Sequence, residues 1–349
     1  MRTLLVTGGA GFIGSNFIRY WLRTHPADTV INYDALTYAG NLENLADICD
    51  APQYHFVRGD ICDAALLDTV FQQHPIDTVV HFAAESHVDR SIHSPDAFIQ
   101  TNIHGTYALL EAAKKHWSGD TSHCRFLHVS TDEVYGTLGP DDAPFSETTA
   151  YAPNSPYSAS KASSDHLVRA YYHTYDFPVL TTNCSNNYGP YQFPEKLIPL
   201  VISNAMEGKA IPVYGDGRNI RDWLYVDDHC SGIDAVLQGG QLGETYNIGG
   251  CNEWPNIDIV TTICDYLDQV APGREPRRNL ISYVVDRPGH DRRYAINADK
   301  MQQQLGWTPA HHFEQAIIST MEWYRANQPW VQSVKSGHYQ DYYRSHYGA

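Results

Sequence analysis

A glycine-rich segment, residues 8–14, directly follows the first short apolar run of the chain, residues 3–7. It leads into residues 12–23, where apolar side chains recur at helical spacing. Glycine permits a tight turn and leaves room for a phosphate beside the backbone, and a helix N-terminus offers unpaired N–H groups and a partial positive charge. The order strand, glycine turn, helix therefore predicts a dinucleotide-binding loop.

Short apolar runs of strand length recur through the first half of the chain, separated by stretches of helix length such as residues 98–115. The runs are residues 3–7, 29–33, 54–57, 78–82, 125–129 and 179–182. Continuous apolar strands that alternate with helices are typical of a parallel sheet covered on both faces. We predict an α/β fold with a Rossmann-like, doubly wound parallel sheet.

The pattern changes after about residue 185, where segments shorten and prolines become frequent. A chain of 349 residues is long enough for two domains. We expect a dinucleotide-binding domain over residues 1–185 and a smaller, mixed substrate domain over most of residues 186–349. Residues 223–240, a strand followed by a helix, are expected to return to the first domain. The aromatic tail after Asn327 is expected to pack on the body.

Composition excludes several classes of protein. The chain has 24 Lys and Arg against 40 Asp and Glu, a net charge of −16, which disfavours nucleic acid as a partner. Its 7 cysteines are scattered with no CxxC pair, which argues against a disulfide scaffold or zinc ribbon. No apolar run approaches the ~18 residues of a membrane span. We expect a cytoplasmic protein that has no membrane partner and, since its histidines lack ligand spacing, no metal.

Acidic and small residues follow the predicted strands. Asp34 ends the second strand, where a carboxylate would bind the adenosine ribose hydroxyls and repel a 2′-phosphate, so NAD is favoured over NADP. Asp60 and Ile61 follow the third strand and are placed near an adenine. Ala83 and Ser86 follow the fourth strand, beside the switch point at which such sheets bind ligands.

Tyr157 and Lys161 form a YxxxK motif at the start of the predicted helix 157–175. The i, i+4 spacing places both side chains on one helix face. A phenol titrates near ~10, so a tyrosine base needs neighbouring positive charge, which Lys161 and a cationic nicotinamide would supply. We interpret Tyr157 as the base for an alcohol that loses hydride and Lys161 as its partner, which also holds the cofactor ribose.

Thr131, Asp132 and Glu133 directly follow the strand 125–129, on the edge that faces the ligand crevice. Adjacent carboxyls disfavour each other's ionisation, so one can stay protonated while the other acts as a base. An acid and a base side by side are what the elimination of water requires. A simple alcohol dehydrogenase needs no such pair.

Together these segments resemble the extended short-chain dehydrogenases/reductases and, within them, the nucleotide-sugar 4,6-dehydratases. The resemblance covers more than nine tenths of the chain. The matching segments are TGGAGFIG (7–14), YDALTYAGNLENL (33–45), FAAESHVDRSI (82–92), STDEVYG (130–136), YSASKASSDHL (157–167), TNCSNNYGPYQFPEKLIPL (182–200), RDWLYVDDH (221–229), YNIGG (246–250) and DRPGHDRRYAI (286–296). The glycine loop and YxxxK are shared by the whole superfamily, whereas Thr-Asp-Glu and the last two segments are specific to the dehydratase branch.

The resemblance implies NAD as cofactor and a nucleotide-sugar substrate, dTDP-glucose. NAD would take a hydride from C4, with Tyr157 as base and Thr131 orienting the 4-hydroxyl. Glu133 would then remove the C5 proton and Asp132 would protonate the departing C6 hydroxyl. Return of hydride to C6 and of a proton to C5 would give dTDP-4-keto-6-deoxy-glucose.

The resemblance also implies two sets of binding residues. The expected NAD contacts are Gly8, Gly11, Phe12, Ile13, Gly14, Asp34, Thr37, Asp60, Ile61, Ala83, Ser86, Tyr157, Lys161 and Asn187. The expected substrate contacts are Ser86, His87, Thr131, Asn186, Lys196, Leu197, Pro212, Val213, Tyr214, Arg221, Asn256, Arg287 and His290. Similar proteins form homodimers through two long helices, for which residues 98–115 and 157–175 are the candidates.

Residues 274–293 concentrate positive charge within this acidic chain, with six arginines against three acidic residues. The guanidinium fork suits a diphosphate. We expect that role for Arg287, and for Arg221 outside this segment, and a solvated surface position for Arg277 and Arg278.

Three alternatives stay open at this point. A nucleotide-sugar 4-epimerase or decarboxylase on the same fold would also oxidise C4 but would not need the pair Asp132 and Glu133. A GDP-mannose-type 4,6-dehydratase would share the chemistry and differ in the pocket for the base. A non-catalytic NAD-binding protein would usually lack the Tyr157 and Lys161 pair.

Overall fold

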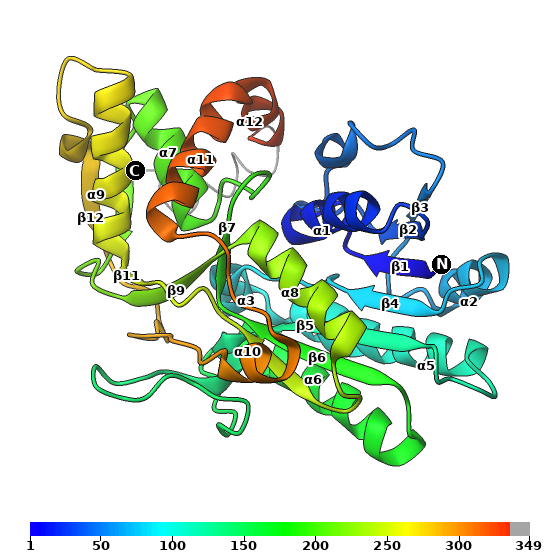
Figure 1. Cartoon of the computed structure of the whole chain (residues 1–349). Helices are drawn as coiled ribbons and strands as arrows, with labels where there is room; N and C mark the ends of the chain where they lie inside the picture. The colour runs from blue at the N-terminus through cyan, green and yellow to red at the C-terminus, as the bar shows by residue number, and fades with distance from the viewer. Residues whose placement is uncertain (336–349) are drawn as a thin grey trace.

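Parallel strands form the central layer of the structure, a computed structural model that describes residues 1–335 (Figure 1). In spatial order the strands are β10 (Thr245–Ile248), β6 (Val179–Cys184), β5 (Arg125–Thr131), β4 (Thr78–His81), β1 (Thr3–Thr7), β2 (Thr29–Asp34) and β3 (Tyr54–Arg58). The chain runs outward from β1 to β3 and then crosses to β4 on the other side of β1. This reversal is the switch point of a doubly wound sheet, so the predicted fold class is confirmed.

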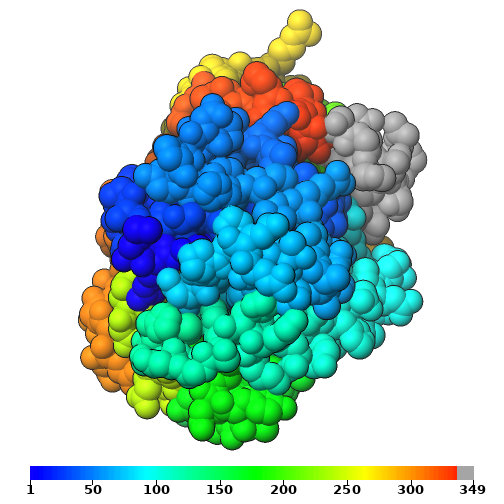
Figure 2. Space-filling model, turned by 90° about the vertical axis from the view of Figure 1, so that its right-hand side faces the viewer, coloured from blue at the N-terminus to red at the C-terminus, as the bar shows by residue number. Residues whose placement is uncertain are grey.

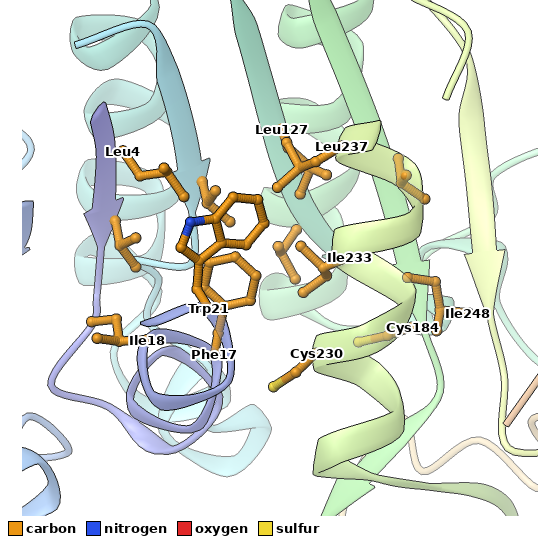
Figure 3. Close-up of a cluster of buried hydrophobic side chains, with 14 of the residues drawn as sticks. Leu4, Phe17, Ile18, Trp21, Leu127, Cys184, Cys230, Ile233, Leu237 and Ile248 are labelled. Carbon is orange, nitrogen blue, oxygen red and sulfur yellow. The ribbon is translucent and has the colours of Figure 1, made fainter. Parts of the chain in front are cut away.

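Helices cover both faces of this sheet because the strands are apolar on both sides. One face carries α1 (Phe12–Thr24), α8 (Val226–Gly239) and α10 (Asp299–Leu305). Phe17 and Trp21 of α1 meet Ile233 and Leu237 of α8 over the strands (Figure 3). The other face carries α2 (Ala64–Gln73), α5 (Thr106–His116) and α6 (Pro156–Tyr175).

The predicted helix 98–115 is interrupted near its start. The chain passes from α3 (Val88–His93) and α4 (Pro95–Phe98) through a wide π-helical segment, Ile99–Gly105, into α5. Asn102 in this segment exchanges two hydrogen bonds with the backbone of Glu85, at 2.9 and 3.0 Å. These hydrogen bonds hold the π-helical segment against the loop after β4. Such π-helical segments are frequent at functional sites.

A second, smaller group of elements packs around its own apolar cluster. Its strands form two small sheets, one of β7 (Asn186–Tyr188), β9 (Ile220–Tyr225) and β11 (Glu253–Pro255), the other of β8 (Ile211–Tyr214) and β12 (Ile281–Val284). Its helices are α7 (Leu197–Glu207), α9 (Asn256–Val270), α11 (Phe313–Ala326) and α12 (Gln328–Val334). Short 3-10 turns lie at Leu42–Leu45 (η1), Asp132–Tyr135 (η3) and Arg277–Leu280 (η4).

Some later segments return to the first sheet. Within residues 223–240 it is the helix α8 that packs beside α1, whereas the strand before it, β9, pairs with β7 and β11. One of the two edge strands of the large sheet is β10, which pairs in parallel with β6. The domain boundary at residue 185 stays a prediction.

The aromatic tail packs on the smaller group of elements as far as the structure describes it. Trp330 and Val331 of the aromatic tail are buried against the smaller group, while residues 336–349 lie outside the described residues. No helix within residues 1–335 has the length and apolarity needed to cross a bilayer.

Candidate active site

A cavity of about 320 Å³ lies at the carboxyl ends of β1 to β6 and extends toward the smaller group of elements. It is lined by every residue predicted to contact NAD: Gly8, Gly11, Phe12, Ile13, Gly14, Asp34, Thr37, Asp60, Ile61, Ala83, Ser86, Tyr157, Lys161 and Asn187. Five more predicted site residues line the same space: Thr131, Asp132, Glu133, Asn186 and Lys196. The structure thus brings the predicted cofactor and catalytic residues together.

The glycine loop at one end of the cavity has no room for side chains. Gly8 has φ +69°, and a Cβ added there would lie 2.7 Å from the Ala83 nitrogen. A Cβ at Gly14 would lie 2.4 Å from the Gly8 oxygen. Gly11 is the N-cap of α1 and has no side chain to accept from its first turn, which also holds no acidic residue. The backbone N–H groups of the first turn of α1 fit the pyrophosphate of a dinucleotide.

Asp34 supports this loop as well as lining the cavity. Its carboxylate accepts hydrogen bonds from the backbone nitrogens of Ala10, at 2.9 Å, and Leu36, at 2.8 Å. Burial raises the pKa of Asp34, and these two hydrogen bonds lower it. The sequence predicted Asp34 as a ribose-binding residue, which stays a prediction, but did not predict its contact with the glycine loop.

Tyr157 and Lys161 lie on the buried side of α6, whose N-cap is Ser155. Lys161 Nζ donates to the Val129 oxygen at 2.9 Å, which fixes the helix against β5. Burial lowers the pKa of Lys161, and the nearby charge of Asp165 raises it.

The electrostatic balance at Tyr157 differs from the sequence expectation. Burial, followed by the charge of Glu133, raises the pKa of Tyr157 well above its ordinary value, while a hydrogen bond with the Thr131 hydroxyl lowers it. The chain's own residues therefore favour the neutral phenol, and positive charge from a bound ligand would favour the phenolate.

Asp132 and Glu133 begin η3, directly after β5, and face the same cavity as Tyr157. The Thr131 hydroxyl caps this turn by accepting from the Glu133 nitrogen at 3.3 Å. Asp132 is 1% exposed, and its Oδ2 is buried with no hydrogen-bond partner among residues 1–335. Burial of a carboxyl oxygen without a partner favours the protonated, neutral form of the acid.

The two acids are held in different environments. Burial and then the charges of Glu133 and Asp222 raise the pKa of Asp132 well above its ordinary value. Burial also raises the pKa of Glu133, but three cations oppose that effect: Arg287, Arg221 and Lys196. Asp132 is thus suited to give a proton and Glu133 to take one.

The remaining predicted substrate residues lie outside the lining of this cavity: His87, Leu197, Pro212, Val213, Tyr214, Arg221, Asn256, Arg287 and His290. Two of these residues contact Asp89 of α3. Arg287 forms an ion pair with Asp89 at 3.0 Å, and the Tyr214 hydroxyl donates a hydrogen bond to it at 3.2 Å. The Arg221 guanidinium lies 4.2 Å from the centre of the Tyr294 ring. Their roles toward a substrate stay predictions.

The arginine-rich segment is divided by its ion pairs. Arg277 pairs with Asp268 and Arg278 pairs with Asp265, and both aspartates lie on α9. Arg287 acts on Glu133 together with Arg221. Among residues 1–335, no group of three or more His, Cys, Asp or Glu side chains is arranged to hold a metal ion.

Sequence reasoning missed several polar residues that complete the site. Ser158 donates to Glu133 at 3.3 Å, and Glu195, 5% exposed, pairs with Arg90 at 3.1 Å. Cys184, at the end of β6, also lines the cavity. Each lies within a motif quoted above, so only its place inside the motif was overlooked.

Comparison with known proteins places this geometry in a family. Residues 5–320 match the family model described as GDP-mannose 4,6 dehydratase. A dTDP-glucose 4,6-dehydratase of Shigella flexneri is 59% identical, with 99% of this chain and 98% of that protein covered. One from Xanthomonas campestris is 60% identical, with 97% of each covered.

Solved structures agree. The Streptomyces venezuelae dTDP-glucose 4,6-dehydratase DesIV, with NAD and TYD bound, has a TM-score of 0.88 and 47% identity, covering 95% of this chain and 100% of that one. The Bacillus anthracis enzyme in complex with NAD has a TM-score of 0.86 and 49% identity over 96% and 100%. The chain therefore belongs to the dTDP-glucose 4,6-dehydratase family, a branch of the extended short-chain dehydrogenases/reductases.

Proposed function

We propose that the protein is an NAD-dependent hydro-lyase that converts dTDP-glucose to dTDP-4-keto-6-deoxy-glucose. The observation that carries this proposal is the pair Asp132 and Glu133, held beside Tyr157 in one cavity with unequal electrostatic environments. Relatives at 55–60% identity bear the name dTDP-glucose 4,6-dehydratase, and solved members of that family contain NAD.

The cavity fits NAD at each end. Gly8 and Gly14 leave no room for a Cβ in the loop that would receive a pyrophosphate, and Asp34 lines the same cavity at the predicted ribose position. Lys161 and Asn187 line the same space. When bound, NAD accepts a hydride from the sugar and returns it at the end of the cycle, so that it is regenerated.

The chain's residues then divide the proton transfers. Tyr157 takes the proton of the 4-hydroxyl, which Thr131 orients. The resulting C4 ketone acidifies the C5–H bond, and Glu133 removes that proton. Asp132 gives its proton to the departing C6 hydroxyl, so that the C–O bond breaks and water leaves. A proton then returns to C5.

Products distinguish this function from the alternatives. Purified protein incubated in D2O with dTDP-glucose should release a product that has lost one water and carries deuterium at C5. A 4-epimerase would give an isomer of unchanged mass, and a GDP-mannose-type dehydratase would prefer GDP-mannose in a parallel assay. NAD binding without any ketone product would leave the non-catalytic reading.

A homodimer is proposed on separate grounds. Ile99, Tyr107 and Tyr175 are large apolar side chains that are about half exposed, and they lie on the two helical segments expected to pair. Light scattering should give twice the chain mass, and Tyr107→Glu should shift the measured mass toward that of the monomer.

A cytoplasmic location is also a proposal. It is supported by the cysteines, which are all unpaired within residues 1–335, and fractionation of cells tests it.

A further inference from the structure

The C-terminal helix α12 reaches the segment that supports the glycine loop. In the space-filling view the red C-terminal helices lie directly against the blue N-terminal part (Figure 2). At this contact Trp330 Nε1 donates to Asn44 Oδ1 at 2.8 Å, across 286 positions of sequence. Trp330 is 8% exposed and Asn44 is 2% exposed, so water does not compete for this hydrogen bond.

Asn44 passes this contact on to the glycine loop. Its Nδ2 donates to the Ala10 oxygen at 2.9 Å, and the Asn41 nitrogen donates to the same oxygen at 3.0 Å. The Ala10 nitrogen in turn donates to Asp34 Oδ2 at 2.9 Å. The Ala10 residue, inside the turn that would receive the pyrophosphate, is therefore held at both its nitrogen and its oxygen.

The indole N–H selects the orientation of the Asn44 amide. An amide has one acceptor and one donor end, and a flipped Asn44 would set its NH2 against the indole N–H and its oxygen against the Ala10 oxygen. Both contacts would then be lost at a buried site, which is costly. Trp330 thus determines that Asn44 offers its donor to the glycine loop.

Trp330 is itself held by an aromatic cluster. Its ring lies 5.2 Å from that of Trp323 and 5.7 Å from that of Tyr191, measured between centroids. Tyr191 also carries the Arg19 guanidinium of α1 at 4.2 Å. Packing therefore sets the position of the indole, and the hydrogen bond to Asn44 depends on that position.

We propose that Trp330 and Asn44 are positioning residues for NAD, which hold the Ala10 peptide in the conformation that binds the dinucleotide. This inference rests on the proposed function, in which the cavity binds NAD. Because coupling between two sites is reciprocal, bound NAD should also stabilise α12.

The test compares two conservative variants of the holoenzyme. Trp330→Phe keeps an aromatic ring and removes the indole N–H. Trp323→Phe is the control, since it makes the same change in the same aromatic cluster and Trp323 has no contact with Asn44 among the hydrogen bonds of residues 1–335. The readout is the rate at which bound NAD leaves after dilution into a trap that consumes free NAD.

We expect release from Trp330→Phe to be about fivefold faster than from wild type, which corresponds to the loss of one buried hydrogen bond, and release from Trp323→Phe to match wild type. Asn44→Asp, which replaces the donor to Ala10 with an oxygen, should accelerate release further. Adding Trp330→Phe to Asn44→Asp should then have little extra effect, because both changes act on one contact. KM for added NAD should rise more than kcat falls.

Hydrogen exchange supplies a second readout. Bound NAD should slow exchange in residues 328–334 of wild type, and less so in Trp330→Phe. Equal release from wild type and Trp330→Phe would overturn the inference, as would equal acceleration in both tryptophan variants, which would assign the effect to ring packing. Wild-type protein that binds no NAD would instead contradict the proposed function itself.

Discussion

The Ser158 hydroxyl donates a hydrogen bond of 3.3 Å to Glu133 Oε2 and so ties the first turn of α6 to the acid pair after β5. Ser158 is fixed in turn by the N-cap Ser155, whose hydroxyl lies 2.7 Å away. Because Tyr157 is the neighbouring residue, one helical turn sets the positions of both predicted bases.

Removing this hydroxyl should affect elimination more than oxidation. Ser158→Ala frees the Glu133 carboxylate to rotate, and we expect loss of the C5 proton to slow about tenfold while the first hydride transfer changes less. Enzyme-bound NADH should then accumulate, visible as nicotinamide absorbance in stopped flow. Ser163→Ala is the control, because this half-buried serine on the same helix donates to the Ala159 oxygen and not to Glu133. Absence of NADH accumulation in Ser158→Ala would remove the assigned orienting role.

Variants of the two acids should block different steps of the reaction. Glu133→Gln should lower kcat at least about 100-fold, because the base for C5 is lost, and should abolish exchange of the C5 proton with D2O. Asp132→Asn should retain C5 exchange and lose the departure of water, because the proton donor is missing. Mass spectrometry of the sugar in D2O separates the two results. Normal turnover by Glu133→Gln would show that another group is the base.

Tyr157→Phe should block the first step. Without the phenol no group takes the proton of the 4-hydroxyl, so we expect no bound NADH after mixing with substrate. Tyr175→Phe is the matched control, since this tyrosine lies at the exposed end of the same helix. NADH that appears in Tyr157→Phe at the wild-type rate would exclude Tyr157 as the base.

The buried acid should cost stability at neutral pH. The pKa of Asp132 is raised well above its ordinary value by burial and by Glu133, so the folded state binds a proton that the unfolded state releases. The contribution of Asp132 to the free energy of unfolding is therefore fully present below the unfolded-state pKa of ~4. It is lost as the pH rises through the pKa of Asp132 in the folded state. Asp132→Asn should raise the melting temperature at pH 7–8 by about 2–4 °C, with the gain shrinking toward pH 4.

Thermal unfolding of wild type, Asp132→Asn and the exposed control Asp141→Asn, measured across that pH range, checks this prediction. A pH-independent gain would mean that the asparagine acts through packing alone. No gain at any pH would contradict the assignment of a buried, protonated Asp132.

The glycine cradle predicts a large effect of a single methyl group. Gly14→Ala would place a Cβ 2.4 Å from the Gly8 oxygen, so the loop must open and the site for the pyrophosphate is lost. We expect NAD affinity to fall at least about 100-fold in calorimetry. Gly273→Ala is the control, because its nearest contact would be an ordinary 3.4 Å. Retention of wild-type affinity in Gly14→Ala would place the dinucleotide elsewhere.

Sequence alone identified the parts of the site that lie next to one another along the chain. Gly8 to Gly14, Thr131 to Glu133, and the pair Tyr157 and Lys161 each occupy one turn between a strand and a helix or one turn of a helix. Local hydrophobic periodicity decides where those turns fall, and a parallel sheet brings the carboxyl ends of its strands to one edge. The cavity could therefore be assembled from its local pieces.

Only the tertiary structure decided how distant segments act on those pieces. The indole of Trp330 reaches Asn44, Arg287 and Arg221 oppose the burial of Glu133, and β10 takes the edge of the large sheet. Burial and then the charge of Glu133 raise the pKa of Tyr157, and neither effect is contained in the local YxxxK motif. Burial and long-range charge depend on which residues pack together after folding, and no local pattern in the sequence encodes that.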